Sequence, residues 1–212
     1  MAAPAPQALD GRSLGRRGTE TRRRLLDATA ALLESVGVRD LKVVDVARSV
    51  GTSPATFYQY FHGVEDAVLA LAEEVGEDLV PLSEVLDRPW TGVDGKAAAR
   101  RLVEQFFAYW DDHRAVLRTR NLAAQEGDRR FRDVRNEALR PLREGLAAKV
   151  AAAQVAGRID AEVSPPAAAA ALAAMLERMA AFHTDLGGIG VSDADVVATT
   201  AHLVFQAVTG ER

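Results

Sequence analysis

The segment Gly37–Phe61, GVRDLKVVDVARSVGTSPATFYQYF, decides the fold that we expect for this chain. Its first part, Val43–Val50, has the composition of a short helix that ends at Gly51, because glycine tolerates the positive φ of a tight turn. Ser53 is a preferred N-cap residue, and Pro54 suits the first helical position, where an N–H has no intrahelical partner. The segment therefore predicts two short helices joined by a tight turn.

Two short helices in this arrangement form a helix-turn-helix, in which the second helix can enter the major groove of DNA while the first supports it. An amphipathic helix is expected in front of the motif, since apolar residues recur at three- and four-residue steps from Leu25 and stop at Gly37. The helix that starts at Pro54 is expected to reach Tyr60, and His62–Gly63 separates it from a fourth helix.

Apolar residues recur at helical spacing through the rest of the chain, and no alternating strand pattern is present. Pro81 is expected to disturb the fourth helix, and a connection containing proline and glycine is expected over 87–95. The expected helices cover 64–80, the stripe at 102–110, 113–126, 128–156, the stretch from Pro165 to Gly187–Gly188, and the stretch after the N-cap Ser192. The predicted fold class is all-α, an N-terminal three-helix helix-turn-helix domain followed by a C-terminal helical bundle.

The composition excludes several classes of protein. The chain has 212 residues and 48% hydrophobic residues, enough for a buried core, and no cysteine, which excludes a disulfide scaffold, a thiolate metal site and a cysteine nucleophile. The longest apolar run, Ala167–Leu176, is far shorter than the roughly 20 residues that cross a bilayer. The N-terminus lacks the apolar core of a signal peptide, so we expect a cytoplasmic protein.

Positive charge gathers at the N-terminus although the net charge is -4. Residues 1–61 hold nine Lys/Arg and six Asp/Glu, whereas residues 62–212 hold seventeen and twenty-four. A basic cluster this dense is either a patch that faces phosphates or a solvated, disordered tail, and composition alone leaves both open. The cluster consists of Arg12, Arg16, Arg17, Arg22, Arg23 and Arg24.

Residues 37–61 closely resemble the N-terminal signature of TetR-family repressors. The matching positions are Gly37, Val43, Val46, Ala47, Gly51, Ser53, Thr56, Phe57, Tyr58, Tyr60 and Phe61. Residues 25–33 and 65–71 extend the likeness loosely, and 90–212 match only the family's general layout of helices. The resemblance implies a disordered basic arm over 1–18, a DNA-binding domain over 19–66, and a ligand-binding and dimerisation domain over 67–212.

The resemblance also divides the motif into a core and a DNA face. Val46, Ala47, Phe57 and Phe61 are expected inside. Tyrosine hydroxyls can reach phosphates, and apolar outward side chains can contact thymine methyl groups, although simple packing is the alternative for the aromatic residues. The residues expected to contact DNA are Arg22, Lys42, Val44, Ser53, Pro54, Ala55, Thr56, Tyr58, Gln59 and Tyr60.

Two positions depart from the family pattern. Lys42 stands where the family usually starts the supporting helix with Ser or Thr, so it cannot cap that helix but can bind a phosphate. Val64 stands where the family often has a lysine. The backbone N–H groups at that helix start can still meet a phosphate, because the helix dipole favours anions there.

The resemblance implies a homodimer that represses transcription on a palindromic operator in double-stranded DNA and is released by a small hydrophobic effector. Ala167–Ala174 with Val196, Thr200, Leu203 and Val204 are the expected dimer surface. The expected ligand-binding residues are Phe106, Phe107, Trp110, Leu117, Asn121, Met175, Met179 and Phe182. Ordinary core packing explains the same apolar residues, and activation in place of repression stays open.

The sequence offers few candidate catalytic residues. Adjacent residues on a helix point in different directions, so Asp111–Asp112–His113 does not converge as a hydrolytic site must. We therefore expect neither catalysis nor a cofactor nor a metal. A purely architectural DNA-binding protein is a third class, and the large C-terminal part argues against it, since DNA binding alone does not need it.

Overall fold

The computed structural model describes Leu9 and residues 12–211, which form helices and no strand. These residues pack as two compact units. The first unit contains the described residues up to Val75 and the segment Arg114–Arg135, and the second contains Gly76–His113 and the described residues from Asn136 onward. Along the described residues, no helix is both long and apolar enough to cross a membrane. The all-α fold class is confirmed, because the described residues form helices and no strand.

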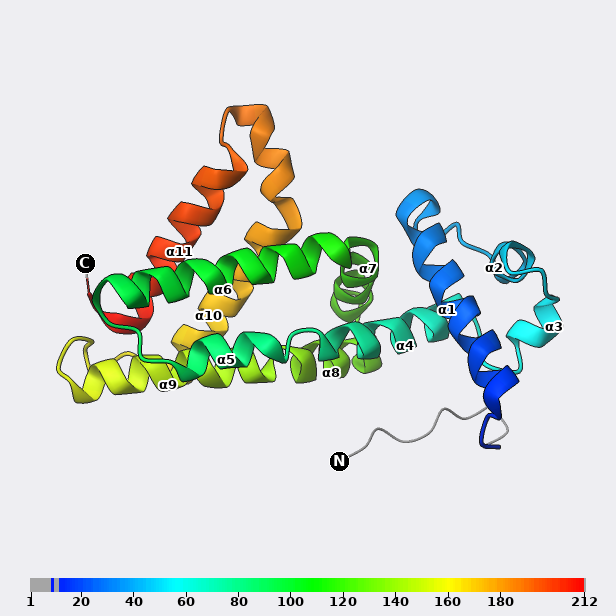
Figure 1. The fold of residues 1–212 in the computed structure, drawn as a ribbon, viewed down its shortest axis with the longest axis horizontal. Helices are drawn as coiled ribbons and strands as arrows, with labels where there is room; N and C mark the ends of the chain where they lie inside the picture. Colours follow the sequence, from blue (N-terminus) through cyan, green and yellow to red (C-terminus); the bar gives the residue numbers. More distant parts are fainter. Residues whose placement is uncertain (1–8, 10–11, 212) are drawn as a thin grey trace. The chain divides into compact units, whose positions relative to one another are not determined.

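The first unit is built around the helix-turn-helix (Figure 1). The expected core is confirmed, because Val46, Ala47 and Phe57 are completely buried and Phe61 is 2% exposed. Gly51 follows the supporting helix with a φ of 69°, which is the turn conformation that the sequence predicts. The helices of the first unit are α1 (Arg16–Val36), α2 (Val43–Ser49), α3 (Pro54–Phe57), most of α4 (Val64–Glu77), α7 (Arg114–Gln125) and the start of α8 (Arg129–Ala138).

Two boundaries in the first unit differ from the prediction. α1 begins at Arg16, so residues 16–18 of the expected arm are helical, and most of that arm, residues 1–8, 10 and 11, lies outside the described residues. α3 ends at Phe57, whereas we expected a helix to Tyr60. The last three residues of that stretch form turns instead, and the Tyr58 N–H donates to the Pro54 carbonyl within them.

The second unit is a helical bundle. α11 packs against α6 and α9, and α10 packs against α9 and α6. Figure 1 shows α10 and α11 as an antiparallel pair joined by η1. The helices are α5 (Pro81–Asp87), α6 (Gly92–Asp112), α9 (Arg140–Val155), α10 (Pro165–Phe182), the 3₁₀ helix η1 (His183–Ile189) and α11 (Asp193–Thr209).

Proline explains most of the differences in this unit. Pro81 starts α5 rather than merely disturbing α4, because proline fits the first turn of a helix. Pro141 lies in the first turn of α9, and the expected helix over 128–156 is divided at Leu139.

The connection before α6 is tight, since a Cβ on Gly95 would lie 2.5 Å from the backbone of Trp90.

Candidate nucleic-acid interface

The start of α3 is fixed by a side-chain cap. The Ser53 hydroxyl accepts a hydrogen bond from the Thr56 backbone N–H at 3.2 Å and lies 3.1 Å from the Thr56 hydroxyl. Pro54 occupies the first turn, where its missing N–H costs nothing. Because these contacts set where α3 begins, they determine which side chains the motif turns outward.

The predicted DNA-contact residues of the motif lie mostly on its surface. Tyr58 is 53% and Val44 is 40% exposed, although both are large and apolar enough to pack in a core. Thr56 and Tyr60 are half-buried. The exposed members are Lys42, Val44, Ser53, Pro54, Ala55, Tyr58 and Gln59. Apolar side chains that stay in water on one motif are typical of a binding surface.

Four of these residues line one open groove of about 550 Å³: Lys42, Val44, Pro54 and Tyr58. The wall opposite them is the start of α4, with Gly63, Val64 and Glu65. The groove therefore brings together the start of α2, α3 and the start of α4. The predicted contacts Ser53, Ala55, Thr56, Gln59 and Tyr60 are not part of its lining.

Charge in the groove is unevenly placed. Lys42 is the only basic residue that lines it, and its side chain caps no helix. The start of α4 is acidic, since Glu65 lines the groove and Asp66 accepts a hydrogen bond from the His62 backbone N–H at 3.0 Å. A phosphate in this groove is thus favoured at the α2 side, where a cation and a helix N-terminus coincide.

Three of the five arginines of α1, Arg22, Arg23 and Arg24, are engaged within the first unit. Arg22 forms an ion pair with Glu74 at 3.3 Å, and its guanidinium lies 5.3 Å from the centre of the Phe61 ring. Arg23 pairs with Glu74 at 3.0 Å, and Arg24 donates to the carbonyl of Val50. The predicted contact of Arg22 with DNA stays a prediction, and it requires the pair with Glu74 to rearrange.

A carboxyl beside this cluster is perturbed. Burial raises the pKa of Glu73 above its usual value, while the nearby Arg22 guanidinium lowers it and the carboxylates of Asp66 and Glu74 raise it further. The Glu73 carboxyl is only partly buried and the residue as a whole is exposed, so the effect on stability is modest. This site belongs to the packing of α1 on α4 rather than to the groove.

The predicted ligand-binding residues divide between the two units. Phe106, Phe107 and Trp110 on α6 are at most 4% exposed. The Trp110 indole N–H has no hydrogen-bond acceptor among the described residues. Met175, Met179 and Phe182 on α10 are half-buried, whereas Leu117 and Asn121 lie on α7 in the first unit. The role of all eight in ligand binding stays a prediction.

Three of the four residues of the expected dimer stripe on α11 are buried within the protomer, so the prediction that this stripe is exposed is wrong for them. Val196, Thr200 and Val204 are at most 3% exposed, because this face packs against α6 and α9 within the protomer. Leu203 is 47% exposed and lies on the other face. On α10, the exposed members of the predicted small-residue stretch are Ala167, Ala170, Ala171 and Ala174.

Polar residues near the end of α6 hold the second unit together. The buried His183 ring lies 3.0 Å from Asp111 through Nε2 and 3.2 Å from Asp193 through Nδ1. His113 instead contacts Asp78 at 3.0 Å. Asp111 and His113 thus point to different partners, as expected for neighbours on a helix, and form no convergent catalytic site.

Comparison with known proteins identifies families over most of the chain. Residues 25–76 match the model of bacterial regulatory proteins of the tetR family, and residues 82–212 match the tetracyclin repressor-like C-terminal domain. The HTH-type transcriptional regulator EthR of Mycobacterium tuberculosis (strain ATCC 25618 / H37Rv) is 31% identical over 109 residues, 51% of this chain and 50% of EthR. The chain therefore spans about half the length of the curated relatives it matches.

Solved structures share the fold. The fatty acid degradation regulator FadR from Bacillus halodurans has a TM-score of 0.66 at 17% identity, covering 92% of this chain and 97% of its own. FadR from Bacillus subtilis in complex with stearoyl-CoA has a TM-score of 0.64 at 18% identity, covering 90% and 99%. PfmR from Thermus thermophilus has a TM-score of 0.60 at 23% identity, covering 89% and 100%. The matched families and relatives are transcriptional regulators and not enzymes.

Proposed function

The chain belongs to the TetR family of transcriptional regulators, and we propose that it is a repressor that leaves a palindromic operator when a hydrophobic effector binds. One observation carries the DNA-binding part of this proposal. Lys42, Val44 and Tyr58 lie in a single groove formed by α2, α3 and the start of α4. In a helix-turn-helix protein, the second helix enters the major groove of DNA, and the residues on and around it contact base edges and backbone phosphates.

The residues of the proposed DNA interface, in the groove and beside it, divide into two roles. The Lys42 ammonium and the hydroxyls of Tyr58 and Tyr60 bind phosphates, which fix the position of the protein without reading sequence. Val44, Pro54 and Ala55 present apolar surface that fits thymine methyl groups, and Gln59 can pair with adenine. Sequence reading therefore depends more on methyl contacts than on hydrogen bonds to guanine.

Repression requires two copies of the motif on one duplex. A homodimer whose recognition elements are about 34 Å apart reaches successive major grooves and matches a palindromic operator. An effector that binds better to a conformer with a different spacing lowers the affinity for DNA by the same coupling factor. We place this cytoplasmic homodimer under the control of an effector bound in the second unit.

The proposed effector is hydrophobic. Phe106, Trp110 and Met175 offer aromatic rings and a flexible thioether, which suit a fatty-acyl, steroid-like or aromatic compound. The fold shared with the stearoyl-CoA complex of Bacillus subtilis FadR supports an acyl ligand within this class. A thermal-shift screen of such compounds tests the proposal, and stabilisation that survives Trp110→Ala and Met175→Ala would place the ligand elsewhere.

The DNA interface is tested with a double variant. Lys42→Ala with Tyr58→Ala should abolish the gel shift of a fragment taken upstream of the protein's own gene, because it removes a phosphate contact and the largest exposed side chain of the groove. Arg101→Ala with Val155→Ala, two exposed positions of the second unit, is the matched control. A folded Lys42/Tyr58 variant that binds as tightly as the control would refute the proposed interface.

A further inference from the structure

The segment Arg114–Arg135 gives the first unit its net positive charge. Residues 1–75 hold nine Lys/Arg against ten Asp/Glu, whereas Arg114–Arg135 holds seven arginines against three acids. The residues of the second unit hold ten Lys/Arg against seventeen Asp/Glu. The basic character of the unit that carries the helix-turn-helix therefore comes from α7 and the start of α8, and not from the motif or the arginines of α1.

Three arginines of this segment, Arg118, Arg129 and Arg132, present unused charge, and the last two are close together on α8. The side chains of Arg129 and Arg132 are exposed and have no hydrogen-bond or ion-pair partner within the described part of the chain. They stand one helical turn apart on α8 and point away from Phe131, which is 1% exposed. Their neighbour Arg130 is bound to the Asp128 carboxylate at 2.7 Å and 3.2 Å. Arg129 and Arg132 thus carry uncompensated positive charge, while the charge of Arg130 between them is balanced by Asp128.

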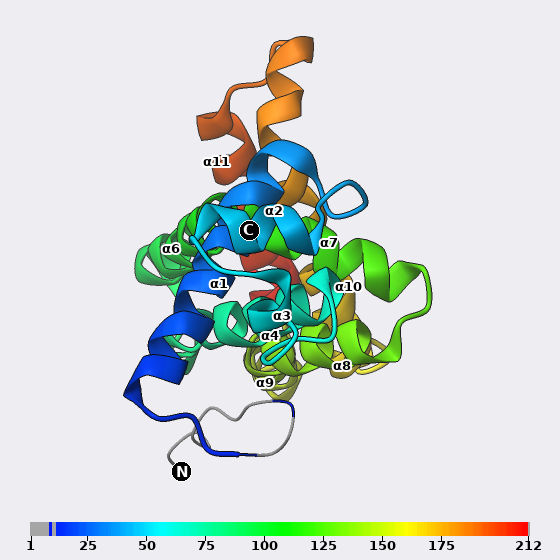
Figure 2. The same cartoon turned by 90° about the vertical axis from the view of Figure 1, so that its right-hand side faces the viewer.

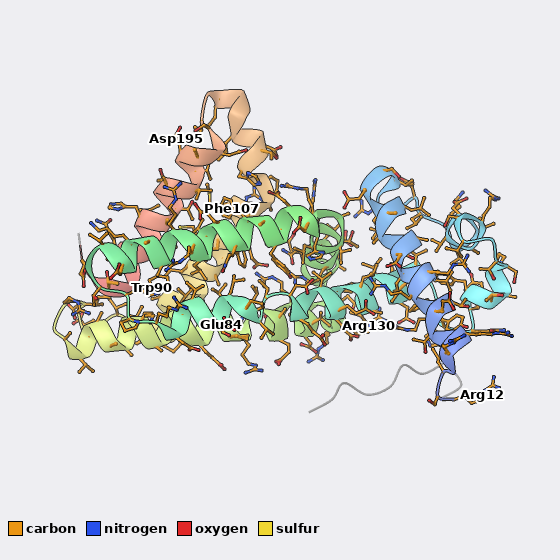
Figure 3. All side chains as sticks on the ribbon, in the orientation of Figure 1. Arg12, Glu84, Trp90, Phe107, Arg130 and Asp195 are labelled. Carbon is orange, nitrogen blue, oxygen red and sulfur yellow. The ribbon has the colours of Figure 1, made fainter. Side chains whose placement is uncertain are left out.

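Contacts within the first unit place this pair beside the candidate groove. In the turn before α8, Glu126 pairs with Arg39 of the α1–α2 loop, next to the groove residue Val38. At the other edge, Arg130, labelled in Figure 3, interacts electrostatically with Glu65 and Asp66 at the start of α4. Figure 2 shows the turn between α7 and α8 to one side of α2 and α3. The start of α8 therefore lies near two segments that reach the groove, the α1–α2 loop and the start of α4.

We propose that Arg129 and Arg132 bind the phosphate backbone of DNA outside the bases that α2 and α3 read. This inference rests on the proposed DNA interface. Guanidinium groups match the geometry of phosphate oxygens and keep their charge at any physiological pH. The first turn of α8 exposes charged residues and no large apolar side chain, so it fits a polyanion better than an apolar protein surface.

The expected effect is electrostatic and independent of sequence. Each phosphate contact contributes about -0.9 to the slope of log affinity against log salt, so Arg129→Ala with Arg132→Ala should flatten that slope by about two per protomer. Between about 50 and about 200 mM salt, the variant should then lose about tenfold less affinity per protomer than the wild type. At low salt, the variant should lose the same factor of affinity, relative to the wild type, for operator DNA and for scrambled DNA.

Fluorescence anisotropy with labelled duplexes measures these quantities. Arg129→Lys with Arg132→Lys should retain most of the slope, and Arg100→Ala with Arg101→Ala on α6 should leave it unchanged. Trimming the duplex from its ends should weaken the wild type at a length where the Arg129/Arg132 variant is unaffected. Melting curves show whether each variant is folded.

An unchanged slope in a folded Arg129/Arg132 variant overturns the inference and leaves these arginines to another partner, such as an acidic protein. That result is distinct from failure of the proposed function. If the Lys42/Tyr58 variant still binds the operator as the wild type does, the groove is not the interface, whatever the slope of the α8 variant.

Discussion

The two predicted binding regions, one in each unit, differ in how far their side chains are exposed. The first unit leaves Tyr58 and Val44 exposed at a groove, while the second buries Phe106 and Trp110 almost completely. The second unit also buries a polar group, His183, between two carboxylates. A surface that meets a macromolecule must be exposed before binding, whereas a region that encloses a small molecule must be covered by its own chain. This difference in exposure is what the proposed roles require, DNA binding by the first unit and ligand binding by the second.

The largest effect is expected at Phe57, the buried residue beneath the groove. Phe57→Ala removes a completely buried ring that packs 5.4 Å from the Phe61 ring, and should cost about 3–5 kcal/mol of unfolding free energy. The exposed neighbour Tyr58 is the comparison, since Tyr58→Ala should cost less than about 1 kcal/mol. Urea denaturation measures both, and equal losses would show that the two side chains do not divide into core and surface.

The next largest effect is expected at His183, whose ring contacts two carboxylates of the second unit. His183→Ala leaves the Asp111 and Asp193 carboxylates without their shared partner and opens space beside Phe107, whose ring centre lies 5.3 Å from the imidazole. We expect a loss of about 1–3 kcal/mol, measured by denaturation. His202 on α11 is exposed, so His202→Ala should change stability by less than about 0.5 kcal/mol. A smaller loss for His183→Ala than for His202→Ala would contradict the assigned contacts.

Both units contain the same kind of serine cap, which allows a direct comparison. The Ser53 and Ser192 hydroxyls each accept a backbone N–H bond at 3.2 Å, from Thr56 and Asp195. Replacing either serine by alanine should cost about 1 kcal/mol. Only Ser53→Ala should also weaken DNA binding, because its cap positions α3. Equal DNA affinity of the two variants would show that the Ser53 cap does not contribute to DNA binding.

The smallest effect concerns pH. The pKa of Glu73 is raised in the folded protein, mainly by burial, so the folded state holds this proton more tightly than the unfolded state. Its contribution to stability is present below the unfolded value of 4.5 and is lost as the pH rises through the raised pKa. Glu73→Gln should therefore gain stability relative to the wild type on going from about pH 4 to pH 7. A difference that does not change with pH would contradict this assignment.

The helix-turn-helix could be predicted because its determinants are local. Gly51 makes the turn, Ser53 caps α3, and Val46 and Phe57 occupy the buried positions that the family resemblance implies. The outward positions Lys42, Val44 and Tyr58 were expected from the resemblance to TetR-family repressors, and all three line the groove. Their contacts with DNA stay predictions.

Other features depend on contacts between distant segments. The ion pair of Arg39 with Glu126 joins residues 87 positions apart, and no local pattern indicates that the start of α8 belongs beside the helix-turn-helix. The face of α11 was also not determined by periodicity, because both faces carry apolar or small residues and only the packing of α6 and α9 shows which one is internal. Arg22 could be recognised as basic, but its pair with Glu74 could not be seen.

A matched pair of valine substitutions tests the central claim that the groove of the first unit binds DNA. Val44 lines the groove and is 40% exposed, while Val155 ends α9 in the second unit and is 92% exposed. A glutamate at either position is accommodated by solvent, but at position 44 it places a negative charge where the phosphates and bases are expected. We predict that Val44→Glu lowers the affinity for the upstream DNA at least about a hundredfold in anisotropy titrations, as expected for burying an unpaired charge at an interface, while Val155→Glu binds as the wild type does. Equal affinities of the two folded variants would contradict the claim.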